Sequence, residues 1–227
     1  FPAIDRLLHA WKASGKTAQP LETLGDCIRA VELHRNTFNR THAALIARLT
    51  GAGIAARTAE AIAGRWLLHG DFLLAELPVT FDVVVGNPPY IRYDALPPDI
   101  ATSYRTTWQT MRGRGDIFVG FFERSLSMLN PDGRVGFICA DRWMRNQYGA
   151  PLRAFVTDGF AVDHVWAMHD VDAFEAQVSA YPAITVMSRR KQGSVVVAET
   201  TAEFGPTAAN SLLEWAQHGT SIDFSSK

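Results

Sequence analysis

The residues best suited to chemistry are Asn87-Pro88-Pro89-Tyr90, which directly follow the apolar run 81–86. The two prolines fix two φ angles and remove two backbone donors, which leaves a stiff turn with outward carbonyl groups. Asn87 adds a side-chain oxygen beside the Pro88 carbonyl, so a planar NH2 group can donate both hydrogens to two fixed acceptors. Tyr90 adds an aromatic face for stacking. The tetrapeptide suits the exocyclic amine of adenine, or a carboxamide such as that of glutamine. The alternative interpretation is an ordinary Pro-Pro turn that ends a strand.

The apolar pattern predicts the elements that position this turn. Residues 81–85 predict a buried strand, and open α/β sheets carry their chemistry just beyond strand ends. Helices are predicted near residues 1–14, 38–51, 56–64, 117–128 and 152–156, and strands near 26–33, 66–68, 81–85, 134–139, 162–168 and 183–187. Residues 91–114 lack strong periodicity and predict an extended loop beside the turn. This alternation predicts an α/β fold with a mostly parallel sheet and helices on both faces.

Composition limits the class of protein. The chain has 227 residues, of which 47% are hydrophobic and 20% charged, so a folded domain with an appendage is expected. Cys27 and Cys139 form no ligand cluster, so we assign no metal site and expect a reducing, cytoplasmic setting. No apolar run reaches the roughly 18 residues of a membrane span. The net charge of −1 is not the basic excess of a module that grips DNA by itself.

The turn and four further segments resemble one family. Asn87–Tyr90 after an apolar strand resembles the catalytic motif of amino-group methyltransferases that use S-adenosylmethionine (SAM), especially the adenine-N6 DNA methyltransferases of restriction-modification systems. Residues 70–73 resemble that family's acidic motif, and residues 28–33 its second strand. Segments 115–124 and 129–138 resemble the helix and strand after the catalytic turn. The resemblance covers about residues 1–192 and implies a Rossmann-like methyltransferase fold.

The resemblance also implies roles for individual residues. A target adenine flips out of the duplex, and its amine donates to Asn87 and the Pro88 carbonyl in the turn that Pro89 stiffens. Tyr90 and Phe174 stack on the two sides of the base.

For the cofactor, the resemblance implies that Glu32 binds the ribose hydroxyls of SAM. Asp71 accepts from the adenine amine of SAM, Phe72 lies nearby, and Phe121 packs on the adenine. Ordinary alternatives stand beside these roles: a solvated acid for Glu32, a turn or N-cap for Asp71, and core aromatics for Phe121 and Phe174. Asp116 is expected to cap the helix that begins at Ile117.

The chain departs from the family pattern in what precedes and follows the motifs. The family carries a Gly-rich loop between its first strand and its first helix, and this chain shows no such loop. We therefore expect a fragment that lacks the first strand and the Gly-rich loop. Residues 193–227 are expected to be a linker or the start of a following module. Double-stranded DNA would be bound through a recognition domain outside this chain, with restriction or defence-system subunits as further partners. Methylation by this chain alone is not expected.

Three other functions stay open. A protein glutamine N5-methyltransferase also uses Asn-Pro-Pro-Tyr, because a carboxamide presents the same NH2 geometry. The long insertion after Tyr90 and the segment 116–124 look more like the DNA family. A cytosine-N4 DNA methyltransferase more often has Ser at the position of Asn87. An inactive remnant that only scaffolds a larger defence complex would not bind SAM.

Overall fold

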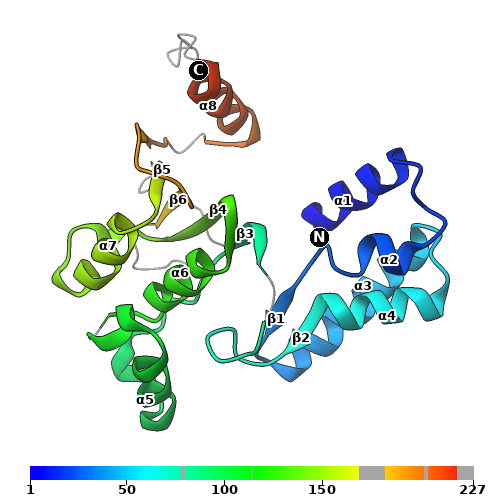
Figure 1. Ribbon diagram of the computed structural model, residues 1–227, viewed down its shortest axis with the longest axis horizontal. Coiled ribbons are helices and arrows are strands. Elements are labelled where there is room, and N and C mark those ends of the chain that lie inside the picture. Colours follow the sequence, from blue (N-terminus) through cyan, green and yellow to red (C-terminus); the bar gives the residue numbers. More distant parts are fainter. Residues whose placement is uncertain (78–79, 114, 169–181, 202–203, 219–227) are drawn as a thin grey trace. The chain divides into compact units, whose positions relative to one another are not determined.

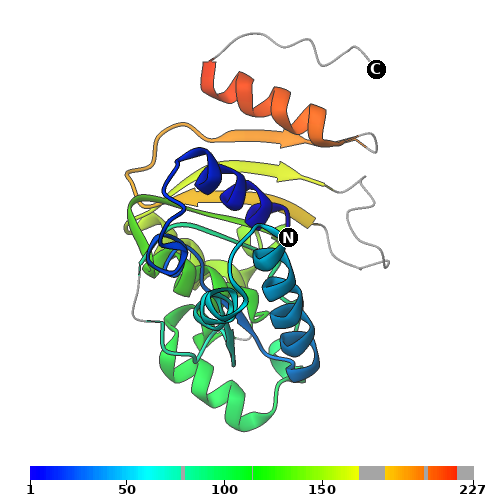
Figure 2. The same cartoon turned by 90° about the vertical axis from the view of Figure 1, so that its right-hand side faces the viewer.

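The computed structural model describes residues 1–77, 80–113, 115–168, 182–201 and 204–218. The chain forms two compact units, Phe1–Leu77 and Pro78–Lys227. No helix among the described residues is long and apolar enough to cross a membrane. Figure 1 shows the elements of each unit, and Figure 2 shows them from a second direction.

The first unit contains four helices and two short strands among its described residues. They are α1 (Pro2–Ala13), α2 (Pro20–Leu24), β1 (Ala30–Glu32), α3 (Arg35–Gly51), α4 (Ala56–Trp66) and β2 (Leu67–His69). β1 and β2 pair in parallel, with Glu32 opposite His69, and α3 and α4 pack against this pair. The strand predicted over 26–33 is therefore shorter than expected. The predicted helices at the start of the chain and near residues 38–51 and 56–64 are confirmed.

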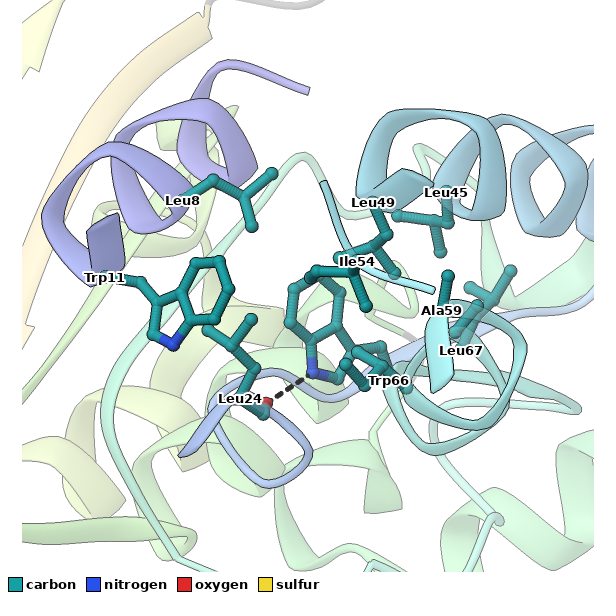
Figure 3. Packing of buried hydrophobic residues seen from close by; sticks show 11 residues of the cluster. Leu8, Trp11, Leu24, Leu45, Leu49, Ile54, Ala59, Trp66 and Leu67 are labelled. Carbon is teal, nitrogen blue, oxygen red and sulfur yellow. Dashed lines mark hydrogen bonds between the residues drawn. The ribbon is translucent and has the colours of Figure 1, made fainter. Parts of the chain in front are cut away.

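The core of the first unit is built around Trp66, which is 1% exposed. Figure 3 shows its indole Nε1 donating to the Leu24 carbonyl, at 2.8 Å. Leu49 and Ile62 are fully buried in the same cluster. A buried carbonyl needs a donor, so this hydrogen bond fixes the end of α2 to α4.

The second unit is a five-stranded sheet with helices. Its elements are β3 (Phe81–Gly86), α5 (Pro98–Thr107), α6 (Phe118–Ser127), β4 (Leu129–Ala140), α7 (Ala150–Thr157), β5 (Ala161–Ala167), β6 (Pro182–Ser188), β7 (Val196–Glu199) and α8 (Pro206–His218), with short 3-10 turns at η1 (Tyr93–Ala95), η2 (Gln109–Arg112), η3 (Asp141–Met144) and η4 (Gln147–Gly149). The strand order is β3-β4-β6-β5-β7. α6 packs on β4 and α7 on β5. Within this unit α5 lies at the end opposite to α8 (Figures 1 and 2).

The sheet is mixed, which corrects the expectation of a mostly parallel one. β3 pairs with β4 and β5 with β7 in parallel, whereas β6 is antiparallel to both β4 and β5. An apolar strand pattern reports burial and not direction, so the sequence could not reveal the reversal of β6. β7 joins this sheet beyond residue 192; the assignment of residues 193–227 to a linker or following module stays a prediction.

Two elements of the second unit differ in extent from the expectation. β4 begins at Leu129 instead of Arg134, because Leu129 already pairs with Phe81 of β3. Residues 130–133 then form an irregularity in this pairing, with Asp132 at φ 62°.

The predicted loop 91–114 contains α5 and two 3-10 turns. Pro98 starts α5 at the first helical turn, where a missing N–H costs nothing. The pair Pro97-Pro98 therefore marks the start of a helix, with Pro97 as the N-cap.

We predict that Trp66→Phe lowers the free energy of unfolding by about 1–3 kcal/mol, because the buried Leu24 carbonyl loses its donor. Urea unfolding of the chain, followed by circular dichroism, measures the loss. Trp11→Phe is the matched control: Trp11 Nε1 donates to the part-buried Thr23 hydroxyl, which water can replace, so its loss should be smaller. Equal losses in the two variants would contradict this account.

Candidate active site

The predicted catalytic turn lies at the carboxyl edge of the sheet. β3 ends at Gly86, and residues 87–90 follow without regular structure; Pro88 is buried, while Asn87 is exposed. Gly86 pairs with Phe137 of β4, and a Cβ on Gly86 would lie 3.2 Å from the Phe137 ring. The glycine allows β3 to approach this ring closely. The structure thus places the four predicted catalytic residues together, next to the chain that leaves β4.

Tyr90 is a neutral aromatic ring at this edge. The side chain is half-buried, and burial raises the pKa of Tyr90 to about 12, with a smaller contribution from the nearby Cys139 thiol. Burial likewise raises the pKa of Cys139, which is fully enclosed. Neither group carries charge at neutral pH, so the surroundings of Tyr90 suit stacking with a flat, uncharged ring.

The insertion that follows the turn, residues 92–116, is closed at its base. Ile117 N donates to the Ile91 carbonyl at 3.0 Å, which joins the two ends of the insertion. Inside it, Arg105 donates to the Tyr93 hydroxyl at 3.2 Å and to the Arg112 carbonyl at 3.1 Å. The Arg105 guanidinium also lies 5.5 Å from the centroid of the Tyr93 ring. The described residues of the insertion therefore form helical turns joined by hydrogen bonds and not an extended loop.

Two buried charged side chains of α6 contact this insertion. Glu123 is 6% exposed, and its carboxylate accepts from Gln109 N at 3.2 Å and Thr110 N at 2.7 Å. Arg124, also 6% exposed, lies with its guanidinium 5.6 Å from the centroid of the Trp108 ring. Sequence reasoning missed both residues. The available signal was an adjacent acid and base inside an otherwise apolar helix, since such residues are seldom buried without partners.

Asp116 does not cap α6, which corrects the expectation. The helix begins at Phe118, its N-cap is Ile117, and no side chain caps it. The Asp116 carboxyl is half-buried, and this burial raises its pKa against the opposing effect of the Arg92 and Arg142 guanidinium groups. The structure therefore holds a half-buried acid just before α6 that gives this helix no capping bond.

Tyr148 connects the chain after β4 to the segment that carries Asp116. A Cβ on Gly115 would lie 2.9 Å from the Tyr148 ring, so glycine is needed for this contact. Burial raises the pKa of Tyr148 to about 12, and Asp116 contributes to the same direction. The Tyr148 hydroxyl is buried and finds no hydrogen-bond partner among the described residues.

The predicted cofactor residues of the first unit come together at the ends of β1 and β2. Gly70 N donates to the Glu32 carbonyl at 3.0 Å, which brings the turn after β2 beside Glu32. The Glu32 carboxylate accepts from His34 N at 2.7 Å through one oxygen, Oε1. Asp71 Oδ1 accepts from Leu73 N at 2.8 Å. Asp71 therefore takes part in a turn, which was the ordinary alternative for this residue. Phe72 follows in this turn and is half-buried.

The remaining predicted residues are less informative. Phe121 is half-buried on α6, whereas its neighbour Phe122 is fully buried and packs on Phe137 and Trp143 at 4.9 and 5.7 Å between ring centroids. Phe121 is thus less buried than Phe122, and its role toward SAM stays a prediction. Phe174 lies outside the described residues. Among the described residues no three His, Cys, Asp or Glu side chains gather as a metal site.

Comparison with solved structures first gives the class of fold. The chain is similar to a crystal structure of the type I restriction-modification system methyltransferase subunit from Streptococcus thermophilus, with a TM-score of 0.58. The match covers 86% of this chain and 43% of that chain at 17% sequence identity, a level that shows the fold alone. The class is therefore an α/β protein with a SAM-methyltransferase-like fold.

Sequence comparison then gives the family. The model of the Eco57I restriction-modification methylase matches residues 31–174, more than half of the chain, so the chain belongs to that family. It is 50% identical over 198 residues to the type II methyltransferase M.PaeR7I of Pseudomonas aeruginosa, and 42% identical over 195 residues to the type II methyltransferase M.XhoI of Xanthomonas vasicola. These matches cover 87% and 86% of this chain, but only 34% and 36% of the relatives. The chain thus spans about a third of their length.

We predict that Asp116→Asn stabilises the protein at neutral pH. The folded state raises the pKa of Asp116 above its usual value of 3.8, so ionisation opposes folding, and stability falls as pH rises through the interval between the two values. The amide removes this penalty. Thermal unfolding of the chain between pH 4 and pH 7 should show a higher midpoint for the variant at pH 7, with the difference shrinking toward pH 4. A lower midpoint at pH 7 would show that the ionised carboxylate is a net stabiliser.

Proposed function

We propose that this chain is part of a site-specific, SAM-dependent DNA methyltransferase that modifies the N6 amine of adenine in a restriction-modification or phage-defence system. The observation that carries the proposal is the Asn-Pro-Pro-Tyr turn at the carboxyl edge of β3, in a chain of the Eco57I methylase family. The relatives M.PaeR7I and M.XhoI are type II methyltransferases, which supports methyl transfer as the reaction.

The proposed chemistry depends on holding an amine in line with a methyl donor. SAM, when bound, supplies an activated methyl group. A base inside duplex DNA cannot reach such a donor, so the target adenine leaves the stack. Asn87 and the Pro88 carbonyl accept from its N6 hydrogens, which orients the nitrogen lone pair outward. Tyr90 stacks on the ring, and Phe174 is proposed to cover its other side. Alignment by these groups supplies most of the rate enhancement.

We propose that the first unit binds the nucleoside part of SAM. The Glu32 carboxylate suits the two ribose hydroxyls, because an acid at a strand end commonly accepts from both in dinucleotide-type folds. Its Oε2 has no hydrogen-bond partner among the described residues, and Oε1 has one, His34 N. Asp71 is proposed to accept from the adenine amine, beside Phe72. The bond from Gly70 N to the Glu32 carbonyl supports this pairing of the two acids.

The surface of β3 supports the proposal that the whole protein contains a first strand and Gly-rich loop outside this sequence. β3 is an edge strand of the described sheet. Its Val83 and Val85 are 63% and 70% exposed, which is unusual for alternating valines in an α/β sheet. Further chain that pairs with β3 and covers these valines would remove the apolar exposure. DNA recognition is assigned to a separate domain, and methylation to the longer protein.

We predict that Asn87→Ala abolishes methyl transfer in the full-length protein while SAM still binds, because the amine loses one of its two acceptors. Duplex DNA treated with enzyme and SAM is digested, and methylated nucleosides are identified by mass spectrometry. Asn210→Ala, an exposed asparagine on α8, is the matched control and should retain activity. The 227-residue chain alone should transfer no methyl group.

The other outcomes of this assay separate the alternatives. Turnover retained in Asn87→Ala would remove Asn87 from the site. Methylcytosine would identify a cytosine-N4 enzyme. Unmodified DNA would direct the assay to glutamine-containing protein substrates, and failure to bind SAM would identify an inactive scaffold.

We predict that Glu32→Ala weakens SAM binding by tenfold or more, since hydrogen bonds to a charged acceptor contribute about 1.5–3 kcal/mol. Titration calorimetry on the full-length protein measures the dissociation constant. Glu32→Gln keeps one acceptor oxygen and should fall between the wild type and the alanine variant. Glu60→Ala, an exposed acid on α4, is the matched control. Unchanged affinity in Glu32→Ala would remove the assigned role.

A further inference from the structure

We propose that Glu123 is a positioning residue for the target-base site, acting through the backbone of the insertion 92–116 on Tyr90. The inference rests on the proposed function and adds to it a residue that lies outside the Asn-Pro-Pro-Tyr turn. It is carried by a series of contacts that begins at the Glu123 carboxylate and returns to the chain directly after Tyr90.

The first contact is a buried anchor. The Glu123 carboxylate accepts from the backbone N–H groups of Gln109 and Thr110 at 3.2 and 2.7 Å, which fixes the start of η2. Thr110 and Met111 are each 1% exposed, so η2 is enclosed by the protein. A buried carboxylate with two N–H donors holds its partners in one geometry, because losing either bond in a low-dielectric setting is costly.

The second contact connects η2 to the first turn of the insertion. The Arg112 carbonyl, in η2, accepts from one Arg105 nitrogen at 3.1 Å. Another Arg105 nitrogen donates to the Tyr93 hydroxyl at 3.2 Å, and the guanidinium lies over the Tyr93 ring. Arg105 thus joins η2 to η1, and η1 begins three residues after Tyr90. A guanidinium suits this task because it is planar and presents several donors in a fixed arrangement.

The third contact closes the series. Ile91 directly follows Tyr90, and its carbonyl accepts from Ile117 N at 3.0 Å. Ile117 is the N-cap of α6, the helix that carries Glu123. The backbone beside Tyr90 is therefore held from both directions, by α6 itself through Ile117 and by the insertion through Tyr93, Arg105 and η2. Both routes start from the same helix.

These contacts fix the position of the Tyr90 ring. Tyr90 can present its ring at a fixed distance only if the chain after it is fixed, because Pro88 and Pro89 constrain the chain only before it. A displacement of about 1 Å in a positioning group can reduce a rate by as much as about a hundredfold. Glu123 is therefore placed to preserve the alignment of the extruded base without touching it.

The test uses Arg105→Ala and Glu123→Gln in the full-length protein. Arg105 is exposed, so its replacement leaves the core intact even if Glu123→Gln folds poorly. Arg134→Ala, an exposed arginine on β4, is the matched control. With an unmodified duplex, we expect both site variants to lower kcat by about tenfold to a hundredfold. With a second duplex that carries 2-aminopurine at the target position, which has no N6 amine to methylate, we expect both to weaken the fluorescence change of base extrusion. The dissociation constant of SAM should stay unchanged.

Two results would overturn the inference. Variants with lowered stability but wild-type kcat and extrusion signal would show that Glu123 is only structural. Additive effects of Glu123→Gln and Arg105→Ala in the double variant would show that the two residues do not act through one series of contacts. Hydrogen exchange at the amides of Thr110 and Ile117 provides a readout independent of activity: it should accelerate in Arg105→Ala and not in Arg134→Ala. If the wild type methylates no DNA, the proposed function fails, while the exchange result still decides whether the contacts are coupled.

Discussion

The parallel pairing of β3 with β4 is the constraint on which the candidate site depends. It brings the turn 87–90 and the chain after Ala140 to one edge of the sheet, because parallel neighbours end on the same side. The close approach of Gly86 to Phe137 makes this pairing specific, since a larger residue would meet the ring. Tyr90, Asp116 and Tyr148 then gather at this edge from segments that lie far apart in the sequence.

A second constraint comes from α6, which contributes to the core and to the site at once. Phe122 packs its ring on Phe137 and Trp143, which fixes the helix on the sheet. The next residue, Glu123, turns toward the insertion and binds its backbone. Because consecutive helical residues point about 100° apart, one helix can serve both tasks. The position of the insertion is thereby tied to the packing of the core.

The sequence was informative where local chemistry determines structure. Periodicity, turn residues and resemblance could predict that a turn follows β3 at residues 87–90, that α1, α3, α4 and α6 are helices, and that Glu32 and Asp71 lie at the ends of β1 and β2. Strand direction could not, because β6 has the same apolar pattern whether it runs parallel or antiparallel. α5 was missed because residues 91–114 lack strong periodicity, although Pro98 suits a first helical turn. For Glu123, the adjacent acid and base in an apolar segment indicated burial with partners, but residue types could not identify those partners, because they are backbone amides.

Two acids of the second unit show how burial alone does not reveal a residue's role. Glu123 is the more deeply buried, yet two backbone N–H groups satisfy it, so its burial is explained by the insertion it holds. Asp116 is only half-buried, but burial still raises its pKa despite the two opposing guanidinium groups, and its side chain caps no helix. Asp116 is close enough to Tyr148 and to the Arg92 and Arg142 guanidinium groups to interact with them electrostatically. Burial therefore means different things for the two acids: Glu123 holds the backbone of the insertion, whereas Asp116 is a half-buried acid whose ionisation opposes folding.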